Sequence, residues 1–135
     1  MNALQHNTQK WLEKSHNDLL SAQILIANTP AILDTACFHC QQAAEKALKA
    51  FLVFKETAFE KSHNLVYLLD LCTIHQREFE SLLPQAQFLS PYSVEVRYPG
   101  DAIAPPPEEA QEALTAANTI WNFVLAQLPT DFHPT

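Results

Sequence analysis

Glycine is nearly absent from this sequence: Gly100 is the only one among 135 residues. Strand-rich folds depend on tight turns, and those turns usually need glycine because it adopts positive φ angles. A parallel α/β nucleotide-binding fold needs a glycine-rich phosphate loop. The scarcity of glycine therefore argues against both classes and favours an all-α fold.

Long apolar runs are also missing. No stretch approaches the roughly 20 apolar residues that span a bilayer, and residues 1–14 lack the apolar core of a signal peptide. We therefore expect a cytoplasmic protein with no membrane partner. The cysteines are odd in number and have no secretory context, so we expect reduced thiols. They are Cys37, Cys40 and Cys72.

Positive charge is scarce as well. Eight Lys and Arg residues stand against fifteen Asp and Glu residues, which gives a net charge of −7. This balance argues against a protein whose bulk charge grips nucleic acid, although it permits a local basic patch. With 47% hydrophobic residues over 135 positions, the chain is expected to form a single domain, residues 1–135, without help from disulfides or metal.

What the sequence does contain is apolar residues at helical spacing. They predict an antiparallel, up-and-down four-helix bundle whose core covers about residues 8–128. A further, shorter helix is expected over Arg77–Leu89, broken at Pro84. The four main helices are expected from about Thr8 to Ala27, Leu33 to Lys55, Ser62 to Ile74 and Pro107 to Leu128.

The segments between and after these helices carry their own signals. Asp34 or Thr35 can cap the second helix, and Ser62 can cap the third. Two prolines and the sole glycine predict an irregular, ordered loop over 90–100, before the last helix. Pro129 ends that helix, and residues 129–135 are expected to form a loose tail.

The second helix carries a polar stripe. At about 100° per residue, Cys37, Cys40, Ala44, Ala47, Leu48 and Phe51 gather on one side. The other side presents the first candidate ligand contacts, in which Lys supplies a charge for phosphate and Gln can contact a base edge. The alternative is an ordinary solvated helix face. The stripe consists of His39, Gln42, Lys46 and Lys49.

Cys37 and Cys40, with His39 between them, raise the question of a metal or redox site. Structural zinc usually needs four ligands from two clusters, and Cys72 is the only other thiol. A redox Cys-x-x-Cys normally lies at a helix N-terminus, where the dipole lowers the thiol pKa. Buried small residues explain the pair better, and we expect no metal and no cofactor.

Four stretches together resemble the HEPN domain family. They are NDLLSAQILI (17–26), CFHCQQAAEKALKAFLVF (37–54), SHNLVYLLDLC (62–72) and YSVEVRYPGD (92–101). The resemblance implies a helical bundle that pairs as a homodimer and a ligand that is a nucleotide or RNA. It also implies partnership with a minimal nucleotidyltransferase, often as a toxin–antitoxin pair.

One departure from the family pattern bears on activity. Ribonuclease members carry an Arg followed a few residues later by a His, and neither Arg77 nor Arg97 is followed by one at that spacing. Metal-free RNA cleavage needs a general base for the 2′-hydroxyl proton and a cation for the phosphate. The sequence therefore predicts a binding module without catalysis.

Three further residues complete the candidate ligand site: His63, Arg97 and Tyr98. His63 follows the expected cap Ser62 and can contact a ligand or simply be exposed. Arg97 can hold a phosphate, or it can pair with a carboxylate of its own loop. Tyr98 can stack on a base, or serve as a core or interface aromatic.

Two other functions stay open beside the binding module. One is a metal-independent ribonuclease with a non-standard set such as His39, His63 and Arg97. The other is a purely structural dimerisation domain. The homodimer itself is also expected because a narrow bundle seam does not need all of the large aromatics present; these are Trp11, Phe38, Tyr67, Trp121 and Phe123.

Overall fold

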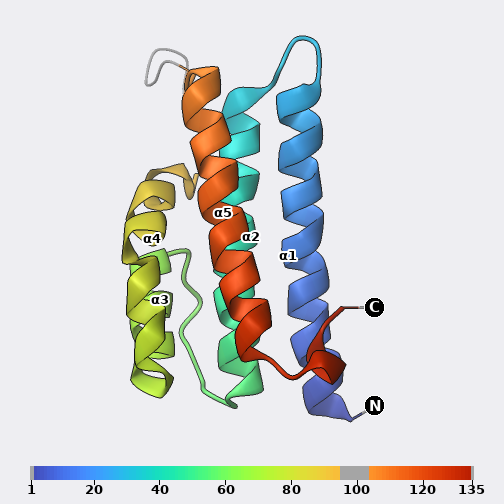
Figure 1. The fold of residues 1–135 in the computed structure, drawn as a ribbon, viewed down its shortest axis with the longest axis vertical. Coiled ribbons are helices and arrows are strands. Elements are labelled where there is room, and N and C mark those ends of the chain that lie inside the picture. Colours follow the sequence, from blue (N-terminus) through green and yellow to red (C-terminus); the bar gives the residue numbers. More distant parts are fainter. Residues whose placement is uncertain (1, 95–103, 135) are drawn as a thin grey trace.

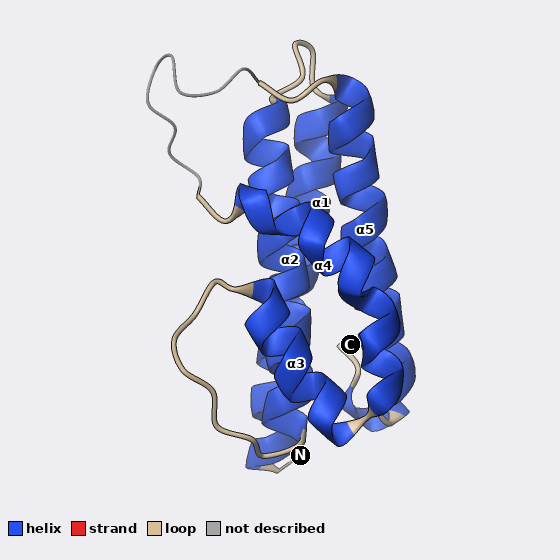
Figure 2. Ribbon diagram, turned by 90° about the vertical axis from the view of Figure 1, so that its left-hand side faces the viewer, coloured by secondary structure: helices blue, strands red, loops and turns tan. Residues whose placement is uncertain are grey.

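The computed structural model describes residues 2–94 and 104–134. These residues form α-helices and short 3-10 turns and contain no strand, which confirms the all-α prediction (Figures 1 and 2). None of their helices combines the length and the hydropathy required to cross a membrane. The α-helices are α1 Ala3–Ala27, α2 Leu33–Phe54, α3 Leu65–His75, α4 Leu83–Leu89 and α5 Pro107–Gln127.

Helix α2 lies at the centre of the bundle, with α1 and α5 running alongside it and α3 and α4 against it (Figure 1). Small residues allow the close approach: Ala43, Ala44, Ala47 and Ala50 are all fully buried. The buried Ser15 hydroxyl of α1 donates to the Ala43 carbonyl of α2 at 2.6 Å. The central helix is thus enclosed by neighbours around most of its circumference.

The third and fourth α-helices together occupy one side of the bundle (Figure 1). Gln76, with extended backbone at φ −151° and ψ 108°, ends α3, and a 3-10 turn over Arg77–Leu82 leads into α4. Pro84 was expected to break a helix over 77–89. It instead lies in the first turn of α4, where the missing N–H leaves no intrahelical bond unmade.

Several helix ends differ from the predicted caps. Helix α1 begins five residues earlier than expected, at Ala3, because Asn2 and Gln5 form a reciprocal capping box. Helix α2 has no side-chain cap, so neither Asp34 nor Thr35 serves as one. Asn64 rather than Ser62 caps α3, accepting from the Tyr67 N–H at 3.1 Å.

The C-terminal residues were expected to be loose, and the structure corrects this. Thr130–Phe132 form a 3-10 turn that lies against α1. The Gln5 amide donates to the Asp131 carboxylate at 2.8 Å, and the Gln9 amide donates to the Asp131 and His133 carbonyls at 3.2 and 3.0 Å. The Phe132 and Phe54 rings pack edge to face, with their centroids 4.9 Å apart. Polar bonds and one aromatic contact therefore hold the tail in place.

Some of the aromatic side chains that suggested an intersubunit surface also make contacts within the bundle. Trp121 is 8% exposed, and the Phe123 ring packs on the buried Phe79 ring with their centroids 4.9 Å apart. Trp11 packs on Phe59 at 6.5 Å. Trp11, Phe38, Tyr67 and Phe123 keep part of their surface exposed, so they stay candidates for an intersubunit surface. Among the described residues, the exposed large apolar side chains are those of Leu20, Ile24, Ile32, Ile74 and Val94.

The docked tail generates a prediction. Phe132→Ala should lower the free energy of unfolding by about 1–2 kcal/mol, because it removes a partly buried ring from Phe54. Thr130→Ala, in the same turn but exposed, should change it by less than about 0.5 kcal/mol. Urea unfolding followed by circular dichroism measures both. Equal, negligible effects would restore the loose-tail interpretation.

Candidate ligand-binding site

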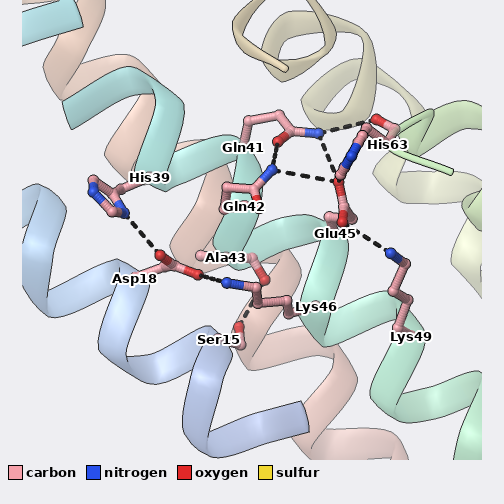
Figure 3. A network of polar contacts seen from close by, with 10 residues as sticks. All are labelled: Ser15, Asp18, His39, Gln41, Gln42, Ala43, Glu45, Lys46, Lys49 and His63. Atoms are coloured by element: carbon pink, nitrogen blue, oxygen red, sulfur yellow. Dashed lines mark hydrogen bonds and ion pairs between the residues drawn. The ribbon is translucent and has the colours of Figure 1, made fainter. Parts of the chain in front are cut away.

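The buried carboxylate of Glu45, on α2, lies at the centre of a polar network (Figure 3). Its residue is 2% exposed. One oxygen accepts from Lys49 Nζ at 2.9 Å. The other accepts from His63 Nδ1 at 2.9 Å and from the Gln41 and Gln42 amides at 3.3 and 3.5 Å. Four donors therefore share one carboxylate, as a buried charge requires.

Gln41 fixes the backbone before α3 to this network. It is fully buried, its amide donates to the His63 carbonyl at 3.0 Å, and its own oxygen accepts from the Gln42 amide at 2.7 Å. His63 is thus held at two points, through its ring by Glu45 and through its carbonyl by Gln41. This arrangement sets where α3 begins relative to α2.

A second, smaller cluster joins α1 to α2 (Figure 3). Asp18, 7% exposed, accepts from His39 Nδ1 at 2.7 Å and from Lys46 Nζ at 2.6 Å. The same carboxylate therefore engages two of the residues predicted from the stripe. In both clusters a carboxylate of this chain already compensates the lysine.

The predicted stripe is consequently not a single exposed face. Lys49 is buried, with its ammonium 5.5 Å from the Trp11 ring centroid and 5.9 Å from that of Phe59. Its charge is held by Glu45 and by these aromatic faces rather than offered to solvent. The side chains of His39 and Lys46 keep about a quarter of their surface exposed, at 25% and 24%.

His63 is the network member most open to solvent, with 69% of its side chain exposed. It lines a hollow of about 440 Å³ together with Ser62, Asn64, Ser90 and Ser93. A carboxylate oxygen can only accept, so Nδ1 carries the hydrogen bonded to Glu45, and Nε2 of the neutral ring is an acceptor. The hollow therefore offers an oriented imidazole and several hydroxyl groups.

Arg97 and Tyr98, and most of the loop predicted over 90–100, lie outside the described residues. Its first part is a 3-10 turn, Ser90–Tyr92. Tyr92, the last residue of this turn, donates its hydroxyl to the Glu109 carboxylate of α5. That bond ties the beginning of the loop to the first turn of the last helix.

The cysteines behave as buried small residues. Cys37, Cys40 and Cys72 are fully buried and form no disulfide. Burial raises the thiol pKa to about 11 for Cys37 and to about 12 for Cys40 and Cys72. The described residues contain no cluster of His, Cys, Asp and Glu able to hold a metal ion. High thiol pKa values are the reverse of what a redox pair or thiolate ligand needs.

Sequence reasoning missed the residues that organise both clusters: Asp18, Gln41 and Glu45. Gln41 lies four residues before Glu45, and Glu45 lies four residues before Lys49. Residues at this spacing are neighbours on a helix, so the pattern could have predicted these contacts. Asp18 is on another helix, and nothing local in the sequence pairs it with His39. The structure is what brings the two carboxylates to the predicted residues.

The chain belongs to the HEPN domain family, whose model matches residues 8–127. It is also similar to TT1696 from Thermus thermophilus, with 32% identity, a TM-score of 0.72, and coverage of 90% of this chain and 98% of that one. ST0689, an archaeal HEPN homologue, is 27% identical with a TM-score of 0.69, covering 89% and 96%. Among curated proteins, none matches.

Family membership defines a nucleotide- or RNA-related class of module. It matches the resemblance carried by the motifs at 17–26, 37–54, 62–72 and 92–101. The polar network is built mainly from the second and third of these segments. The family assignment and the network thus single out the same part of the chain.

The Glu45 network generates a stability prediction. Glu45→Ala should cost about 3–5 kcal/mol of unfolding free energy, because it leaves the buried Lys49 ammonium without its carboxylate. Glu45→Leu combined with Lys49→Met should recover most of that loss, since neither charge then remains buried. Chemical denaturation of the three proteins measures this. Glu13→Ala, in the exposed pair with Lys10, is the control, with less than about 1 kcal/mol expected.

Proposed function

We propose that the chain is a non-catalytic module that binds a nucleotide or RNA. The observation that carries this proposal is the placement of His63: its ring is oriented by a buried carboxylate and faces a hollow lined by Ser62, Ser90 and Ser93. The hydroxyl groups of Ser62 and Ser93 can donate hydrogen bonds to phosphate oxygens, and Nε2 of the neutral His63 ring can accept one from a sugar hydroxyl. Arg97 and Tyr98 remain proposed partners in the same site, for phosphate and base.

The charges of the two clusters favour a small or single-stranded ligand over a long duplex. Asp18 and Glu45 offset Lys46 and Lys49, so these four residues sum to zero. Duplex binding draws most of its free energy from many uncompensated cations. A site of this kind must rely on a few directed bonds, assisted by one arginine.

A metal-independent ribonuclease is the second candidate, and one observation favours it. Glu45 and Asp18 hold His63 and His39 through Nδ1, which leaves Nε2 of each ring as a base. A carboxylate that orients a histidine ring in this way prepares the ring to act as a general base. The cation for the phosphate would be Arg97, as in the set His39, His63 and Arg97.

We also propose that the module acts with other chains, as a homodimer and with a minimal nucleotidyltransferase in a toxin–antitoxin-like pair. The motifs described above and the family membership support this. A purely structural dimerisation domain is the remaining alternative. It predicts tight self-association with no nucleotide binding, so the binding experiment below separates it from the primary proposal.

The ligand prediction is tested with labelled single-stranded RNA and with nucleotides in EDTA. Arg97→Ala should weaken binding by about 1.5–3 kcal/mol, the usual worth of a charged hydrogen bond, and His63→Ala by about 0.5–1.5 kcal/mol, the worth of a neutral one. Lys14→Ala removes the same charge from an exposed position on α1 and should leave affinity almost unchanged. Equal losses in all three variants would mean that only bulk charge attracts the ligand.

The same assay decides between binding and cleavage. The parent protein should bind RNA and leave it intact. Cleavage by the parent that disappears in a His39→Ala, His63→Ala double variant would establish the ribonuclease instead. His63→Gln retains hydrogen bonding without a titrating base, so it should preserve more binding than His63→Ala but no cleavage.

The self-association prediction concerns mass in solution. Analytical ultracentrifugation at micromolar concentration should give twice the 15.2 kDa of the chain. Because the net charge is −7, higher salt should not dissociate the pair and should slightly strengthen it by screening repulsion. A monomeric mass at every salt concentration would contradict the homodimer.

A further inference from the structure

A groove between α4 and α5 shares no lining residue with the hollow beside His63. Its volume is about 560 Å³, and its apolar wall consists of Pro84, Phe88 and Ala116. Figure 2 shows the two helices crossing on this side of the bundle. A volume of this size accommodates a few side chains of another molecule.

The groove has an acidic rim that helix chemistry explains only in part. Glu108 and Glu112 both line it. Glu108 lies in the first turn of α5, where the helix dipole favours a negative charge, but this effect falls off beyond that turn and does not account for Glu112. The two are also spaced four apart, so they repel each other on one helix face.

Neither of these glutamates has an ion-pair partner within residues 2–94 and 104–134. The groove lining itself contains no Lys, Arg or His. Glu109, between them in sequence, is by contrast engaged by the Tyr92 hydroxyl. Two neighbouring carboxylates beside an apolar wall are therefore left uncompensated in the described part of the chain.

Gln85 supplies an independent observation at the same place. It lines the groove, and its side-chain oxygen is shielded from solvent with no hydrogen-bond partner in the described structure. A buried acceptor without a donor costs about 1–3 kcal/mol. Because this oxygen has almost no exposed surface, a bound molecule brings it an N–H or ammonium donor only once the Gln85 side chain has turned toward the groove.

We propose that the α4–α5 groove binds a cationic amphipathic segment of a partner protein. Apolar side chains of that segment contact Phe88 and Ala116, and its Lys or Arg side chains pair with Glu108 and Glu112. A donor of the segment can also bond to the Gln85 oxygen once that side chain has turned toward the groove. Symmetric self-pairing across the groove fits poorly, because it would bring the glutamates of both copies together. An anionic membrane surface is repelled by the same two carboxylates.

The experiment uses two synthetic helical peptides with one apolar pattern, one built from Leu and Lys and the other from Leu and Glu. The ¹⁵N-labelled full chain is titrated with each and followed by NMR. The Lys peptide should shift amide signals of Phe88, Gln111, Thr115 and Thr119, and the Glu peptide should not. Shifts confined to other surfaces, or equal shifts with both peptides, overturn the proposal.

Variants separate the groove from general attraction to an acidic protein. Glu108→Gln with Glu112→Gln should weaken the Lys peptide by about 10-fold, the combined worth of two exposed ion pairs. Thr119→Lys, at an exposed position of the lining, should weaken it similarly by adding a like charge. The matched control is Glu13→Gln with Glu78→Gln, two exposed glutamates away from the groove, which should change affinity less than twofold.

An equal loss in the control pair, or no loss in the groove variants, overturns the proposal. The proposed nucleotide or RNA site involves none of these residues. Binding of RNA should therefore be the same in the groove variants and in the parent protein. Each proposal can consequently fail without the other.

Discussion

The carboxylate of Glu45 is buried inside the bundle, on the central helix α2, which contacts the other four α-helices. Its burial constrains much of the structure around it. A buried ion is costly unless donors replace the water that it loses. Lys49 from the same helix and His63 from the segment before α3 supply the strongest of those donors. Lys49 in turn needs a low-polarity cover for its stem and charge, which Trp11 of α1 and Phe59 provide. The buried carboxylate of Glu45 thus constrains α1, α2 and the segment between α2 and α3.

The fold was largely predictable because it depends on local patterns. Helical spacing of apolar residues and the single glycine indicated an all-α protein, and α1 ends at Ala27, where the sequence predicted its end. Local signals were less reliable at helix ends, where several residues can cap. Asn64 caps α3, although Ser62 is an equally good cap by type. Glu56 adopts the left-handed φ of 50° after α2, a position that glycine usually takes.

The candidate site was only partly predictable, because its geometry depends on contacts between helices. A helical wheel assigns a residue to a direction but does not say what lies there. Lys49 was expected on a contact face and is buried, since α1 and the segment holding Phe59 cover that face. Asp18 is 21 residues from His39 in sequence, and no local pattern connects them. The tail behaved likewise, because its partners Gln5 and Gln9 are at the other end of the chain.

That contact between the two ends has a topological consequence. Gln5 and Asp131 are 126 residues apart in sequence yet hydrogen-bonded, and both ends lie at the same end of the bundle (Figure 1). This contact brings the two ends of nearly the whole polypeptide together, and the entropic cost of closing such a loop rises only slowly with its length. A few linking residues could join the termini covalently, with new ends opened in the exposed turn at 28–32. We therefore expect a circularly permuted chain, with the helices in a different order along the sequence, to form the same arrangement of helices in space.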